Sequence, residues 1–450
     1  MKRFVFNNLI YKLDNEFYLL VNLISFRRQT VKKDKLMALQ AIEEKQNNGE
    51  ILTTEECEIL DELYKSKQIL PDVTISEVDN QMKKSSFISF DRFPVKSITF
   101  NLTHQCNFQC NYCYQNNYKE VLEFKQLMKK EDIDLICQYL SDDSFNSEIL
   151  EEIVISGGEP LLVQNIEVIN YILNSFSTKK FMLFTNGENI YSFKDKIDFN
   201  KIDEYQISLD GPDEIIRSVN KRSGNIFEKV IKGIKHIESL GKKISIVVMW
   251  SKELEDYLDK FIFLLKESKI LDYDNIKIRF TIAKSYYSVY EVDENIYGLD
   301  YLKDLTKRIN PKLKEANSHL ELFSNLDSLG SIMHRQKNSR IPMRIKRCDM
   351  TRSIPMVFEP NGEVFWCVCL GNENGRIGKY KDGIFIDKDK LLKFGNRTIF
   401  QIEQCSKCNL KYICSGGCVL PLTSGSYDLY SPACGIFGLT YFWEHLEEFV

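Results

Sequence analysis

The chain has 450 residues, of which 43% are hydrophobic and 28% charged, and its formal net charge is −4. This length exceeds what one hydrophobic core usually covers, so we expect two or three domains. The slightly acidic balance gives no reason to expect nucleic acid as a partner, and no apolar run reaches the roughly 18 residues that cross a membrane. The polar first residues do not resemble a secretory signal, which predicts a cytoplasmic protein.

Residues 1–90 are expected to form an N-terminal unit. Alternating apolar runs at 4–13 and 16–26 predict short strands, and helical stretches follow near Lys35–Gln46 and Thr54–Lys67. The second stretch opens with Thr-Thr-Glu-Glu, which is typical of a capped helix start. The polar tract 72–86 is interpreted as a linker.

Residues 91–310 show a regular alternation of strands and helices. The stretch 225–241 places Ile226, Val230, Ile231, Ile234 and Ile237 on one helical face and stops at Gly241. Such alternation predicts an α/β fold with a parallel sheet covered by helices, in the form of a partial (β/α)6 TIM-like barrel. The six expected strands lie at residues 97–103, 152–158, 180–187, 204–211, 243–250 and 275–283.

Residues 311–450 break this rhythm. They hold eight of the 13 cysteines and a hairpin signal at Asn361-Gly362. We expect a small cysteine-rich unit that is held by metal rather than by a core. In a reducing compartment, grouped cysteines favour metal or cluster ligation over disulfides. Cys57 and Cys137 stand apart from the groups and are expected to be small buried residues.

Three cysteines, Cys106, Cys110 and Cys113, lie directly after the first expected barrel strand, where active-site groups belong in such folds. Three thiolates on one loop can hold three irons of a 4Fe–4S cube and leave the fourth iron open. A zinc knuckle with His104 as an extra ligand is the alternative. The C-x3-C-x2-C spacing with Tyr112 before the last cysteine resembles the radical S-adenosylmethionine (SAM) superfamily. The resemblance implies that SAM binds the open iron and is cleaved to a 5′-deoxyadenosyl radical.

The following strand ends carry polar and glycine motifs that resemble the SAM contacts of that family. Gly157, Gly158 and Glu159 form a GGEP motif, whose glycines allow close approach of a ligand and whose carboxylate can meet an ammonium group. By the same resemblance, Asn186 and Ser208 would face SAM. Arg222 would bind the SAM carboxylate, with Lys221 as its rival. The resemblance also places Tyr112 with these cofactor-binding residues.

The C-terminal cysteines resemble the SPASM extension of some radical SAM enzymes, which carries two auxiliary 4Fe–4S clusters. The resemblance assigns Cys348, Cys367 and Cys418 to the first cluster, whose fourth position is either filled by Cys369 or open to substrate. It assigns the other four to the second cluster. Two zinc sites are the alternative, because CxxC pairs often bind zinc. The four cysteines of the second set are Cys405, Cys408, Cys414 and Cys434.

Radical SAM enzymes with such extensions commonly modify peptides, and the N-terminal unit is compatible with a winged-helix-like element that binds leader peptides. The resemblance therefore implies a peptide maturase that installs a thioether or carbon–carbon crosslink or a related modification. A flavodoxin- or ferredoxin-type donor would supply electrons. An anaerobic sulfatase maturase is the runner-up, although Val368 follows Cys367 where that group typically has Asp. A non-catalytic metal-binding scaffold is the third alternative.

Overall fold

The computed structural model describes most of the chain. No helix in this part is long and apolar enough to span a bilayer. The described residues are 4–5, 8–12, 15–22, 28–66, 70–71, 77, 79–83, 92–113, 115, 126–282, 299–317, 320, 322–323, 345, 354–368, 373–408, 411–417, 419 and 428–432.

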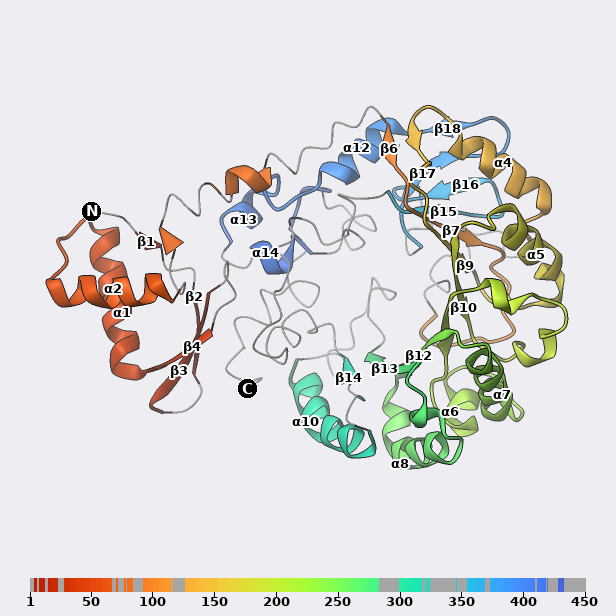
Figure 1. Cartoon of the computed structure of the whole chain (residues 1–450), viewed down its shortest axis with the longest axis horizontal. Coiled ribbons are helices and arrows are strands. Elements are labelled where there is room, and N and C mark those ends of the chain that lie inside the picture. Colours follow the sequence, from red (N-terminus) through yellow and green to blue (C-terminus); the bar gives the residue numbers. More distant parts are fainter. Residues whose placement is uncertain are drawn as a thin grey trace.

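A curved eleven-stranded sheet is the largest sheet of the described part, and in Figure 1 it lies on the side away from the N-terminal unit. Its order is β14-β13-β12-β11-β10-β9-β7-β15-β16-β17-β18, and neighbours from β14 to β15 pair in parallel. All six strands predicted for the barrel are present in chain order, and the sheet stays an open arc, so the partial barrel is confirmed. These strands and β14 are β7 (Ser97–Asn101), β9 (Glu152–Ser156), β10 (Lys180–Thr185), β11 (Glu204–Ser208), β12 (Lys243–Trp250), β13 (Ile276–Ile282) and β14 (Leu322–Phe323).

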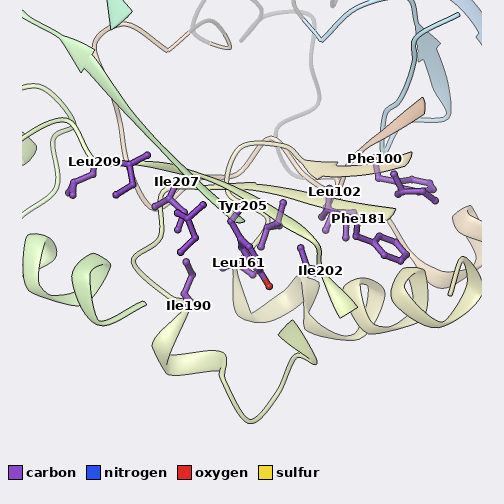
Figure 2. Close-up of a cluster of buried hydrophobic side chains, with 14 of the residues drawn as sticks. Phe100, Leu102, Leu161, Phe181, Ile190, Ile202, Tyr205, Ile207 and Leu209 are labelled. Atoms are coloured by element: carbon purple, nitrogen blue, oxygen red, sulfur yellow. The ribbon is translucent and has the colours of Figure 1, made fainter. Parts of the chain in front are cut away.

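Helices cover the outer face of this arc (Figure 1). In α7 the buried residues include all five apolar positions that the sequence pattern places on one face. Figure 2 shows side chains such as Phe181, Tyr205 and Ile207 between the strands and this outer layer. The helices are α4 (Lys130–Leu140), α5 (Ile166–Ser175), α6 (Asp213–Ser218), α7 (Ile226–Ser239), α8 (Lys252–Glu267) and α10 (Leu299–Ala316).

The expected C-terminal hairpin extends the barrel sheet. Gly362 has a φ of +94°, and β15 pairs in parallel with β7 on one side and antiparallel with β16 on the other. Phe358, Trp366 and Tyr380 are fully buried in the same core as the barrel, so the expectation of a unit without a core is wrong for this part. The elements are β15 (Met356–Phe358), β16 (Glu363–Phe365), β17 (Arg376–Lys379), β18 (Phe385–Ile386), α12 (Lys388–Asn396), α13 (Glu403–Ser406) and α14 (Lys411–Cys414).

The N-terminal unit has a three-stranded antiparallel sheet and two helices around a separate core that includes Leu20, Ile42 and Leu63. The predicted helix start at Thr53 is confirmed, because Thr53 and Glu56 form a reciprocal capping box. The elements are β1 (Phe4–Val5), β2 (Asn8–Lys12), β3 (Phe17–Asn22), β4 (Arg28–Lys32), α1 (Lys33–Asn47), α2 (Thr54–Lys65) and β5 (Leu70–Pro71), and two short strands follow, β6 (Phe93–Pro94) and β8 (Phe145–Asn146).

The two isolated cysteines are exposed, which corrects the expectation that they are buried. In α4 the core face is formed by Ile133, Ile136 and Tyr139, so Cys137 falls on the outer face. In α2 the buried residues are Leu60 and Leu63, and Cys57 lies on another side of the helix. Helical periodicity, rather than residue type, decides the burial of both.

Candidate active site

The three-cysteine loop begins against the end of β9. Gly158 N donates to Thr103 O at 2.6 Å, and Glu159 N donates to Gln105 O at 2.9 Å. A Cβ on Gly158 would lie 2.3 Å from Gln105 O, and one on Gly157, whose φ is +140°, would lie 2.6 Å from Thr103 O. The two glycines therefore allow the backbone at the base of the cysteine loop to approach the strand end.

The thiols of this loop lie in a dense environment. Although Cys106 keeps an exposed face, the surrounding protein raises the pKa of its thiol to about 12, with the Glu159 carboxylate adding to the effect. Burial likewise raises the pKa of the Cys110 thiol to about 12. Phe108 N donates to Cys106 Sγ at 3.3 Å. Without a metal both thiols are therefore protonated at neutral pH, and binding iron would displace their protons.

Three thiols on one loop can each bind a different iron of an iron–sulfur cube. Within the described residues, no three His, Cys, Asp or Glu side chains converge closely enough to hold one metal ion. A cube requires separated thiolates, because each binds a different iron. His104 Nε2 lies 2.7 Å from Glu359 Oε2, and both side chains are about 5% exposed. His104 therefore pairs with the C-terminal hairpin through Nε2, and the zinc knuckle stays an alternative prediction.

The Glu159 carboxylate joins the ends of β9 and β10. Its Oε1 accepts from Leu161 N at 2.8 Å and from Thr185 Oγ1 at 2.6 Å, and its Oε2 accepts from Asn186 N at 2.7 Å. Burial raises the pKa of Glu159 to about 7 in spite of these bonds. The described contacts of this carboxylate are those of a structural link, and its predicted contact with a ligand ammonium stays a prediction.

A second buried carboxylate, Glu188, follows β10 and is contacted by four donor atoms from three residues. Arg222 contacts it with Nε at 3.0 Å and with a terminal nitrogen at 2.8 Å, Lys229 Nζ lies at 2.9 Å, and Asn107 Nδ2 lies at 2.6 Å. Burial alone would raise the pKa of Glu188, but the bonds from Arg222 and Lys229 outweigh it and lower the pKa. Lys221 instead contacts Ser218 O at 2.6 Å.

Asp210 is a third buried carboxylate near the cysteine loop, and it accepts hydrogen bonds from three residues. It is 3% exposed, and its oxygens accept from Met249 N at 2.9 Å, from Asn220 Nδ2 at 2.6 Å and from the Tyr112 hydroxyl. Asn220 Nδ2 also lies 3.1 Å from Cys110 Sγ. Burial raises the pKa of Asp210 and holds that of Tyr112 well above its ordinary value.

Two more predicted site residues lie at neighbouring strand ends. Asn186 follows β10, and its Nδ2 donates to Asn107 Oδ1 at 2.8 Å, which connects it to the cysteine loop. Ser208 is the last residue of β11 and is half-buried. The structure therefore joins Tyr112, Gly158, Glu159, Asn186 and Arg222 to the cysteine loop by hydrogen bonds or shared partners, and Gly157 lies close to the backbone of Thr103.

The C-terminal cysteines are described only in part. Cys405 is buried, Cys367 and Cys408 are half-buried, and Cys414 ends α14. The remaining predicted ligands lie outside the described residues. They are Cys348, Cys369, Cys418 and Cys434.

A buried arginine holds the loops around these cysteines. Arg397 is 6% exposed and donates to the carbonyls of Leu429, Gly416, Gly417 and Ser431 at 2.7 to 3.2 Å. Four acceptors compensate the burial of its charge. The segments joined in this way flank the positions of Cys414, Cys418 and Cys434 in the sequence.

Sequence reasoning did not assign Asn107, Glu188, Asp210, Asn220 or Arg397 to any site. Glu188 and Asp210 follow the strands β10 and β11 closely, and a search for polar side chains after every barrel strand would have found them. Asn220 and Arg397 carry no such signal, because the residues that they contact lie far away in the sequence: Cys110 is 110 residues from Asn220, and Leu429 is 32 residues from Arg397.

Comparisons with known proteins show which families and folds the chain resembles. Residues 100–265 match the family model of the radical SAM superfamily. A probable GTP 3′,8-cyclase from Pyrococcus horikoshii is 26% identical over 234 residues, which are 51% of this chain and 71% of the relative. The radical SAM cyclopropyl synthase TigE from Paramaledivibacter caminithermalis is 23% identical over 379 residues, 75% of this chain and 72% of that protein.

Two solved structures share the fold. Streptococcus suis SuiB bound to precursor peptide SuiA covers 97% of this chain and 100% of its own, with a TM-score of 0.52 and 15% identity. The structure of anSMEcpe with bound AdoMet covers 78% of this chain and 95% of its own, with a TM-score of 0.53 and 19% identity.

Proposed function

We propose that this chain, whose residues 100–265 match the family model of the radical SAM superfamily, matures a ribosomally made precursor peptide. When bound, SAM and a 4Fe–4S cluster supply a 5′-deoxyadenosyl radical that abstracts hydrogen from the peptide. The product would carry a thioether or carbon–carbon crosslink or a related modification. Cys106, Cys110 and Cys113 would hold the cluster, and a flavodoxin- or ferredoxin-type protein would supply electrons.

The observation that carries the peptide proposal is the extent of the structural likeness. The match to SuiB includes nearly the whole chain, whereas the cyclase match covers about half of it. The N-terminal sheet has the order β2-β3-β4, and its outer strands offer backbone groups to which an extended peptide can add as a strand. This arrangement supports leader binding by a winged-helix-like unit at residues 1–90.

The proposed SAM contacts use the groups that surround the loop. Arg222 and Lys229 bring two cations to Glu188 beside the cysteine loop, and a cation at this position suits the SAM carboxylate. Ser208 and Asn186 lie at the strand ends, and Tyr112 is held by Asp210. We further propose that Gly157, Gly158 and Glu159 shape the side that receives the amino group.

The C-terminal cysteines are proposed to hold two auxiliary 4Fe–4S clusters. One set would be Cys348, Cys367 and Cys418 with Cys369 as its fourth ligand. The loops that Arg397 holds flank several of these positions, which supports a preorganised site. The other set would be Cys405, Cys408, Cys414 and Cys434.

A sulfatase-maturase activity is the second candidate, favoured by the likeness to anSMEcpe over 78% of the chain. Val368 follows Cys367, so an aliphatic side chain stands where such enzymes typically have Asp. An aliphatic group cannot accept a proton from the substrate. We therefore rank formylglycine formation below crosslinking.

The experiment is anaerobic reconstitution with iron and sulfide, followed by SAM, dithionite and a candidate peptide from a neighbouring reading frame. We expect 5′-deoxyadenosine, deuterium transfer into it from deuterated peptide, and loss of two hydrogens from the peptide. Cys106→Ala should abolish SAM cleavage but keep leader binding and the auxiliary iron. Cys137→Ala, which changes an exposed cysteine outside the groups, is the matched control and should retain activity.

Each failure has a separate meaning. An absence of 5′-deoxyadenosine together with iron near zero would contradict the enzyme assignment and favour a scaffold. SAM cleavage that a sulfatase-derived Cys or Ser peptide stimulates, and the candidate peptide does not, would transfer the proposal to formylglycine formation. Stimulation by GTP would reject a peptide substrate.

A further inference from the structure

One amide group lies directly against a cluster-binding cysteine. Asn220 follows α6, is 2% exposed, and its Nδ2 lies 3.1 Å from Cys110 Sγ and 3.1 Å from the Tyr112 hydroxyl oxygen. An N–H group that faces the sulfur of a cysteine donates to it, and the donation strengthens when the sulfur is a thiolate.

The orientation of this amide is determined by Asp210. Asn220 Nδ2 lies 2.6 Å from Asp210 Oδ2, and Asp210 is itself held by Met249 N at 2.9 Å. Rotating the amide by half a turn would place its carbonyl oxygen against the carboxylate and remove the donor from the sulfur. The NH₂ side of Asn220 therefore faces both Asp210 and Cys110.

The backbone keeps Asn220 beside Cys110. Gln109 N donates to Asn220 O at 2.9 Å, and Asn111 N donates to Val219 O at 3.0 Å. These two bonds bracket Cys110 on the loop, so residues 219–220 pair with the loop much as a neighbouring strand would. The amide-to-sulfur contact thus belongs to a fixed register rather than to a mobile side chain.

We propose that Asn220 is a positioning residue that holds the Cys110 thiolate and raises the reduction potential of the SAM-binding cluster. The inference rests on the radical SAM assignment and does not depend on the peptide substrate. A hydrogen bond to a ligating sulfur draws negative charge from it and stabilises the reduced cluster, which carries more negative charge. Asp210 supports this role by orienting the amide.

The test compares Asn220→Leu, which keeps the approximate size but has no donor, with the reconstituted wild-type enzyme. An EPR-monitored redox titration follows the signal that changes when SAM is added. We expect a potential lower by about 59 mV, which corresponds to a roughly tenfold smaller reduction constant for one electron. Asn220→Ser is the second variant for the case in which the leucine form does not load its cluster. Its shorter side chain withdraws the amide and should give a shift in the same direction.

Asn275→Leu is the matched control. This half-buried asparagine donates to Lys242 O at 2.8 Å, near the other end of the sheet, and its replacement should leave the potential unchanged. A cluster-loaded Asn220 variant with the wild-type potential, or with a higher one, would overturn the proposal. That result would leave the enzyme assignment standing, because 5′-deoxyadenosine formation measures it separately.

Discussion

At the scale of single residues, the contacts of Glu159 differ from those that its sequence motif predicts. It belongs to a motif associated with ligand binding, yet its two oxygens accept from Leu161, Thr185 and Asn186 in the interior. Burial disfavours the charged carboxylate and raises its pKa from 4.5 to about 7. Glu159 therefore joins the ends of β9 and β10, and its titration contributes to the pH dependence of the free energy of unfolding.

Glu159→Gln is expected to remove one component of that pH dependence. Between about pH 4.5 and about pH 7 the folded protein binds a proton at Glu159 that the unfolded chain has released, so the free energy of unfolding falls as pH rises through this window. Above it this contribution is constant. Glutamine does not titrate, so between about pH 4.5 and about pH 7 the slope of the free energy of unfolding against pH should become less negative than in the wild type.

The substitution should also lower stability by about 1–3 kcal/mol at the acidic end, because an amide NH₂ would face a backbone donor. Glu204→Gln, at an exposed ion pair with Lys243, is the control and should keep the wild-type slope. An unchanged slope in Glu159→Gln would mean that the carboxyl group titrates normally.

At the scale of elements, the hairpin of β15 and β16 is joined to β7 by more than backbone pairing. Glu359, between the two strands, accepts from Asn101 Nδ2 at 2.6 Å and lies 2.7 Å from His104 Nε2. Its backbone oxygen accepts from the Tyr380 hydroxyl at 2.7 Å. One buried carboxylate therefore connects the hairpin to β7 and to the start of the loop that carries the three predicted cluster cysteines.

Glu359→Ala should loosen that connection. Without the Glu359 carboxylate, Asn101 Nδ2 and His104 Nε2 lose this acceptor, which costs about 1–3 kcal/mol in the free energy of unfolding. Hydrogen exchange should accelerate together in residues 97–101 and 356–358. Glu363→Ala, which breaks a partly exposed pair with Arg376, is the control and should change stability by about 1 kcal/mol or less. Faster exchange in the hairpin alone would contradict the coupling.

At the scale of the whole molecule, the tract interpreted as a linker contacts the cysteine-rich end of the chain. Asp79 accepts from Lys411 Nζ at 2.8 Å and from the Tyr412 hydroxyl. Met82 packs against a small core that includes Ile402 and Cys405. The connection between the N-terminal unit and the barrel is thus attached beside two predicted cluster ligands, Cys405 and Cys408.

Asp79→Ala is expected to release this attachment. Loss of a partly buried ion pair and a hydrogen bond should cost about 1 kcal/mol locally and increase hydrogen exchange in residues 399–412. Exchange in the barrel strands should stay the same. Glu77→Ala changes an exposed carboxylate on the same segment and serves as the control. Equal effects of the two substitutions would show that Asp79 has no specific role.

Local patterns in the sequence determined much of this protein. Strand and helix positions follow from apolar periodicity, as in α7, and the placement of Cys106 after a strand follows from the same pattern. Each of these features depends on residues that are close together in the sequence, within one or two turns of a helix or within one strand. The cysteine spacing is local as well, which is why the radical SAM assignment could be made before the fold was known.

Only the tertiary structure decided which distant groups meet. Asn220 lies 110 residues from Cys110, and Asn101 lies 258 residues from Glu359. No periodicity encodes such pairs, because they arise when separate strands are laid side by side in one sheet. The hairpin was foreseeable from Asn361-Gly362, but its pairing with β7 depended on which edge of the barrel sheet remained open.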